Sequence, residues 1–175
     1  GFLVPWTLHS HGPRHARLEL ALPQDHRWPF GGTAAQRIEV SGRGLALELS
    51  VTAGAQAMPV AIGWHPWFRK PERMVFEPEA MYPRDSQGIA VLPPGPVQPG
   101  PWDDCFVNRR EVVLYRGGQC IRLASECSDW VVYDAPAFAT CVEPQTAPPD
   151  AFNLVPGQAL QPGETLAARF SLRWE

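Results

Sequence analysis

The sequence lacks the long apolar runs and uninterrupted helical stretches on which membrane-spanning proteins and helical bundles depend. No apolar run approaches the roughly 20 residues that cross a bilayer as a helix. The 175 residues include 15 glycines and 20 prolines, one residue in five, and these interrupt the windows in which a helix could form. The composition excludes a helical bundle and predicts a β-rich fold with many loops.

Polybasic segments and cysteine motifs are also absent. The net charge is -3 and the pI is about 6.0, so neither nucleic acid nor a membrane surface is expected as a partner. The four cysteines follow neither a CxxC nor a zinc-knuckle spacing. We therefore expect reduced, mostly buried cysteines, a cytoplasmic protein and no metal. The cysteines are Cys105, Cys120, Cys127 and Cys141.

The signatures of several enzyme classes are missing as well. There is no glycine-rich phosphate loop, no Gly-x-Ser-x-Gly segment and no recognisable pairing of a cysteine with a base. Phosphoryl transfer, serine hydrolysis and cysteine proteolysis therefore have no support.

Alternating apolar and polar residues are present in many short runs. In the clearest run, 45–52, three leucines and a valine share one face. The other runs that predict strands are 16–22, 37–40, 112–115, 120–123, 130–133, 139–142 and 165–174. Glycine-rich turns at 41–44 and 116–119 join two pairs of runs as hairpins. The pattern predicts an all-β antiparallel sandwich or barrel over residues 1–175.

His65 differs from the other four histidines in its surroundings. It lies between Trp64 and Trp67 in a segment that follows the strand-like residues 59–62, and Pro66 restricts its backbone. It could be a hydrogen-bonded core histidine or a group that transfers protons. The cluster from His9 to His15 is interrupted by Gly and Pro, and we interpret it as a solvated loop.

Two acidic segments complete the candidate site. Glu143 follows an apolar strand and precedes Pro144, so we expect the strand to leave the sheet there and the carboxylate to face the rim. Gln145 suits a sugar hydroxyl, although Glu143 could instead cap a loop. Asp103 and Asp104 follow Trp102 in a predicted loop, where they suit a vicinal diol or simply form a turn. Aromatic walls with few charged groups are what a sugar site requires.

These three motifs, in this order, resemble the aldose 1-epimerase (galactose mutarotase-like) family. Residues 63–68 resemble its strand-end histidine motif and residues 102–106 its aspartate-containing sugar loop. Residues 143–153 resemble its catalytic glutamate segment. The resemblance implies a large antiparallel β-sandwich, or supersandwich. In the family, an Asn/Arg motif and a further histidine precede the segment that Gly1–Trp6 resembles. We therefore expect a single domain, 1–175, whose N-terminal part is missing.

The resemblance also implies an isomerase of carbohydrate metabolism that interconverts the α and β anomers of a free aldose. Glu143 would act as base and protonated His65 as acid, with no cofactor. Their attraction is expected to lower the pKa of Glu143. Because no cluster of Arg or Lys lies near the motifs, we expect a neutral aldohexose as the monosaccharide partner.

The resemblance assigns the remaining site residues to the sugar. Asp103 would orient hydroxyl groups, with Asp104 as the less favoured member of the pair, while Trp64, Trp67 and Trp102 would pack on the sugar face. Two alternatives stay open: a non-catalytic carbohydrate-binding sandwich, and a glycosidase that uses Glu143 and Asp103 as its carboxylates.

Overall fold

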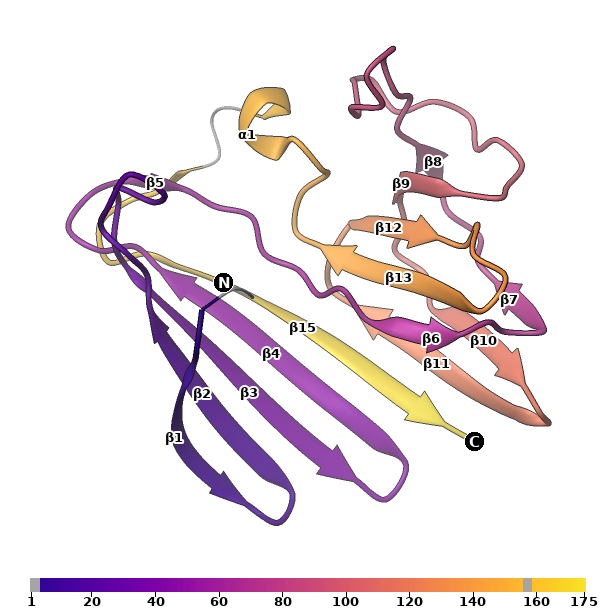
Figure 1. The fold of residues 1–175 in the computed structure, drawn as a ribbon, viewed down its shortest axis with the longest axis horizontal. Coiled ribbons are helices and arrows are strands. Elements are labelled where there is room, and N and C mark those ends of the chain that lie inside the picture. The colour runs from indigo at the N-terminus through magenta and orange to yellow at the C-terminus, as the bar shows by residue number, and fades with distance from the viewer. Residues whose placement is uncertain (1–3, 156–158) are drawn as a thin grey trace.

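The computed structural model describes residues 4–155 and 159–175, and two antiparallel sheets dominate it (Figure 1). Residues Gly1 to Leu3, part of the segment compared with the family's N-terminal region, lie outside the described residues. The larger sheet has eight strands in the order β1 (Thr7–Gly12), β2 (His15–Ala21), β3 (Thr33–Ser41), β4 (Gly44–Thr52), β15 (Thr165–Trp174), β11 (Gln119–Ser125), β10 (Val112–Arg116) and β7 (Arg73–Val75).

The smaller sheet covers one half of the larger sheet (Figure 1). Its five strands, in order, are β6 (Trp67–Arg69), β13 (Ala139–Gln145), β12 (Asp129–Tyr133), β9 (Asp103–Val107) and β8 (Ala80–Met81). A third, two-stranded sheet pairs β14 (Ala159–Leu160) with β5 (Met58–Pro59). Among the described residues the only helix is α1 (Ala151–Leu154), which has four residues. The described part of the chain therefore contains no helix long and apolar enough to cross a membrane.

The predicted all-β antiparallel sandwich is therefore confirmed. Apolar side chains from the inner faces of the two sheets form its central core. Trp130 of β12 and Phe170 of β15 are almost fully buried and meet edge to face, with ring centroids 6.3 Å apart. Because each aromatic ring removes a large apolar area from water, this contact is a principal attachment between the sheets.

The strands with strict alternation match their predicted ranges closely, and four other predictions are wrong. Residues 60–62 lie outside any strand, because pairing ends at Pro59. The segment with Asp103 and Asp104 is strand β9 rather than a loop, because it pairs along its whole length with β12. His9 and His11 belong to β1, which pairs with β2 in a hairpin, although their side chains are exposed.

The fourth error concerns the position of Glu143. Strand β13 does not leave the sheet there but continues through Pro144 to Gln145, paired with β12. Both backbone groups of a residue in an antiparallel strand point to the same neighbour. The Pro144 carbonyl accepts a hydrogen bond from the Trp64 amide at 3.1 Å, so it points away from β12. The backbone nitrogen of Pro144, which has no hydrogen to donate, points the same way, and no hydrogen bond to β12 is lost. Proline is tolerated at such a position.

Candidate active site

His65 and Glu143 meet on the outer face of the five-stranded sheet. The Nε2 atom of His65 lies 3.4 Å from Oε1 of Glu143. The imidazole side chain is 62% exposed, whereas the carboxylate side chain is only 8% exposed. An exposed imidazole next to a buried carboxylate can exchange protons with a ligand that approaches from solvent.

The strand register explains this contact. Trp67 of β6 stands opposite Cys141 of β13, and an isolated bridge joins Gly63 to Gln145. In an antiparallel pair these two points place His65 opposite Glu143. A Cβ atom at Gly63 would lie 2.7 Å from the Pro144 carbonyl oxygen, closer than non-bonded contact allows. Glycine is therefore required for this approach.

The electrostatics of Glu143 differ from the expectation. Burial raises the pKa of Glu143 above its ordinary value, and this effect outweighs the lowering by the Cys141 hydrogen bond and the positive charge of His65. A lowered pKa was predicted because the sequence could not show that the Glu143 side chain is buried on this face of the sheet. Gln145 approaches the same carboxylate, with Nε2 3.4 Å from Oε2. A raised pKa on a carboxylate beside an exposed imidazole is typical of a proton-transfer site.

Trp67 provides an aromatic surface beside this pair. Its ring lies nearly parallel to the His65 imidazole at a centroid separation of 5.8 Å, and it meets Tyr133 edge to face. The Trp67 side chain is half exposed. The register places Trp67, Cys141, Tyr133 and Asp103 in one row across four strands. An apolar sugar face could pack on Trp67 while its hydroxyl groups reach the polar side chains of the row.

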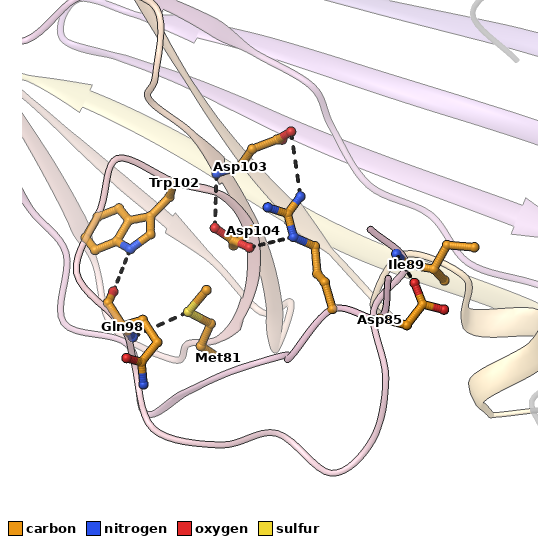
Figure 2. Close-up of polar contacts among 8 residues, drawn as sticks. Met81, Asp85, Ile89, Gln98, Trp102, Asp103 and Asp104 are labelled. Carbon is orange, nitrogen blue, oxygen red and sulfur yellow. Dashed lines mark hydrogen bonds and ion pairs between the residues drawn. The ribbon is translucent and has the colours of Figure 1, made fainter. Parts of the chain in front are cut away.

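The other two candidate tryptophans pack within the protein. Trp64 packs against two separate clusters of buried apolar side chains, one of them the core between the sheets, and its ring lies 5.6 Å from that of Phe170. Its indole nitrogen is buried with no hydrogen-bond partner among the described residues. Trp102 packs against Phe106 and donates from Nε1 to the Gln98 carbonyl oxygen at 2.8 Å, which fixes it to the proline-rich segment 93–101 (Figure 2). The geometry therefore favours Trp67 over both as a sugar platform.

Asp103 and Asp104 share a cation. Arg84 places Nε 3.0 Å from Oδ1 of the buried Asp104 and a terminal nitrogen 3.9 Å from Oδ2 of the exposed Asp103. The Asp103 amide also donates to Oδ2 of Asp104 at 3.1 Å (Figure 2). The exposed Asp103 is thus free to accept hydrogen bonds from a ligand, while Asp104 is held within the protein.

Hydrogen bonds also hold the turn that follows Arg84. Arg84 pairs with Ala90, and the Asp85 carboxylate accepts hydrogen bonds from the Gln87 and Ile89 amides; Asp85 and Ile89 appear in Figure 2. Carboxylates that accept neighbouring backbone amides stabilise tight turns.

Sequence reasoning missed Cys141 as part of this site. Its Sγ lies 3.0 Å from Nδ1 of His65 and 2.9 Å from the Pro66 carbonyl oxygen, so a cysteine does lie beside a base. Extending the predicted strand to Gln145 would have placed Cys141 on the same face as Glu143, two residues away. Burial and the nearby Glu143 raise the pKa of the Cys141 thiol. All four cysteines are described, and all are buried with free thiols.

Comparison with known structures shows which class of fold carries this site. The chain is similar to a protein of Escherichia coli K12 provisionally assigned as an aldose 1-epimerase, with a TM-score of 0.82 and 22% identity over 99% of this chain and 69% of the other. It is also similar to a galactose mutarotase-like protein of Clostridium acetobutylicum, with a TM-score of 0.82 and 16% identity over 97% of this chain and 66% of the other. Galactose 1-epimerase of Lactobacillus acidophilus NCFM gives a TM-score of 0.80 at 16% identity, with the same coverages of 97% and 66%.

The fold is therefore galactose mutarotase-like, and the chain spans about two thirds of the length of these structures. The sequence profile of the family described as Aldose 1-epimerase matches residues 1–173, so the chain belongs to that family. The expected family resemblance is confirmed. No protein of curated function matches the sequence significantly.

Proposed function

We propose that this site performs the acid–base ring opening of an aldose 1-epimerase, with Glu143 as general base and protonated His65 as general acid. The contact of 3.4 Å between the imidazole and the carboxylate carries the proposal. The anomeric hydroxyl and the ring oxygen are bonded to the same sugar carbon, so an acid and a base that serve both must be neighbours.

The reaction follows from these positions. Glu143 removes the proton of the anomeric hydroxyl while His65 protonates the ring oxygen, and the ring opens to the aldehyde. Rotation about the C1–C2 bond and ring closure, with the proton transfers reversed, give the other anomer. Protons are only exchanged, so the reaction requires no redox cofactor.

The neighbouring residues would bind the substrate. Trp67 would pack against the sugar face, Asp103 would accept hydroxyl hydrogen bonds, and Gln145 would orient the Glu143 carboxylate. Arg84 pairs with both aspartates, which offset its charge. A neutral aldohexose therefore remains the proposed substrate, and the buried free thiols support a reducing, cytoplasmic setting.

The deciding experiment follows a freshly dissolved single anomer of glucose or galactose by polarimetry or NMR, with the spontaneous rate subtracted. It uses the natural polypeptide that contains these 175 residues. We expect mutarotation above the buffer rate and its near loss in Glu143→Gln. Sugar binding with only the buffer rate would instead favour the non-catalytic binding protein. An unchanged rate in Glu143→Gln would show that another group is the base.

A further inference from the structure

Three potential metal ligands converge at the proposed active site. Among the described residues, His65, Cys141 and Glu143 each offer one ligand atom, and these atoms lie within 4.8 Å of one another. The thiol and the carboxylate come from the same face of β13, and the imidazole faces them from the segment before β6. The three side chains therefore surround one small volume.

This donor set is suited to zinc. Cysteine sulfur, histidine nitrogen and carboxylate oxygen are the ligands that Zn²⁺ prefers in proteins. Tetrahedral zinc, with bonds of about 2.0–2.3 Å, separates its donor atoms by about 3.4–3.6 Å. The sulfur lies 3.0 Å from one imidazole nitrogen, and the carboxylate oxygen lies 3.4 Å from the other. One ion uses only one of these two nitrogens, so the exposed imidazole would turn until that nitrogen faces both the sulfur and the oxygen.

We propose that His65, Cys141 and Glu143 bind one Zn²⁺ ion in competition with the sugar. The buried thiol is the innermost ligand, and the exposed imidazole is the outermost. Because the part of the chain that the structure describes supplies three protein ligands here, the fourth tetrahedral position is left for water. The thiol loses its proton to solvent as the sulfur–zinc bond forms.

Zinc at this position would inhibit the enzyme. The ion would bind a lone pair of the Glu143 carboxylate and one of His65, so neither group could transfer its proton to or from the sugar. Zinc binding is independent of the proposed function, whereas inhibition depends on it. The two can therefore fail separately in an experiment.

Binding is tested first, without any assay of activity. The affinity for Zn²⁺ is measured by competition with a colorimetric chelator, and Co²⁺ serves as a spectroscopic probe of thiolate ligation. We expect one ion per chain and a thiolate-to-cobalt charge-transfer band. In Cys141→Ser the band should vanish, and the Zn²⁺ affinity should fall at least about 10–100-fold. Mutation of residues that only hydrogen-bond to metal ligands already lowers metal affinity by that factor.

Cys120→Ser is the matched control. Its sulfur also lies near a carboxylate, 3.9 Å from Oε2 of Glu175, and the control should keep full affinity and the band. Circular dichroism and thermal melting establish that each variant is folded. If Cys141→Ser does not fold, His65→Ala provides the second test, because it removes the exposed ligand and should reduce the affinity equally.

Two results would overturn the proposal. One is no Zn²⁺ binding to the wild-type chain, and the other is binding that persists unchanged in both variants, which would place the ion elsewhere, for example at the exposed His9 and His11. Mutarotation that is measurable but unaffected by saturating Zn²⁺ would refute the competition with sugar. Zinc that binds through Cys141 in a protein without mutarotase activity would support the metal site and refute the proposed function.

Discussion

Trp67 of β6 stands opposite Cys141 of β13, and this pairing fixes where His65 meets Glu143. A shift of the register by one residue would turn the imidazole to the other face of the sheet. The proposed chemistry thus depends on a backbone alignment as much as on the reacting side chains.

The first prediction concerns the coupling of the proposed acid and base. Glu143→Gln and His65→Asn should each lower the rate of mutarotation by about 10²–10⁴-fold, because each removes a proton-transfer group but keeps its approximate size. The double variant should lose less than the product of the two factors, since both groups act in one event. Polarimetry on the three variants measures this. Strictly multiplicative losses would mean that the two residues act in separate steps.

The second prediction concerns stability. Burial raises the pKa of Glu143, so the folded chain binds a proton there more readily than the unfolded chain does. Its contribution to the free energy of unfolding is present at low pH and is lost as the pH rises through the raised pKa. Glu143→Gln should therefore have a higher Tm than the wild type at neutral pH, and the difference should shrink in acid. A gain of about 1 kcal/mol corresponds to about 2–4 °C for a chain of this size.

Melting curves by circular dichroism at several pH values provide the measurement. Glu77→Gln is the matched control, because the Glu77 side chain is exposed and pairs with an exposed arginine, Arg110. It should show almost no change in Tm at any of these pH values. A Glu143→Gln protein less stable than the wild type at neutral pH would contradict the role of burial.

The third prediction concerns Gly63. Gly63→Ala should destabilise the fold by about 1–3 kcal/mol, because the added methyl group would meet the Pro144 carbonyl and separate His65 from Glu143. Denaturant unfolding and mutarotation should both show the effect. Gly42→Ala is the control, since a Cβ atom there meets nothing within 4 Å. Equal stability of both variants would show that the segment adapts without strain.

The fourth prediction concerns Arg84 as a positioning residue. Arg84→Met should leave the buried Asp104 without its guanidinium donor and cost about 1–3 kcal/mol of stability. The KM for the sugar should rise while kcat changes little, because Asp103 would lose its alignment but the acid and base would remain. Arg109→Met, at an exposed pair with Glu79, should alter neither constant. A fall in kcat at constant KM would contradict the positioning role.

The sequence predicted those parts of the fold that repeat a local pattern. Strand β15 alternates strictly over its ten residues, and its predicted range is the one observed. Strand β9 was not predicted, because aspartates have little preference for strands and a proline-rich segment precedes them. Pairing with β12 and β8 and the burial of Phe106 outweigh that local preference.

The proximity of His65 and Glu143 was expected from the family resemblance, but the strand register that produces it was not. Motif resemblance singled out His65 and Glu143, whose contact requires a sheet register that no local pattern reveals. Cys141 lies 76 positions from His65 along the chain, so their proximity could not be read from spacing. The sign of the Glu143 pKa shift depends on burial, which the sequence does not specify.

The position of β15 has a consequence for the order of folding. This strand lies between β4 and β11, so it joins the first four strands of the larger sheet to the strands that lie beneath the smaller one. It also supplies Phe170 to the core between the sheets. The larger sheet therefore cannot close until residues 165–174 have left the ribosome, and until then the inner edges of β4 and β11 lack partners. Such late, long-range pairing slows folding and leaves strand edges open to aggregation during synthesis.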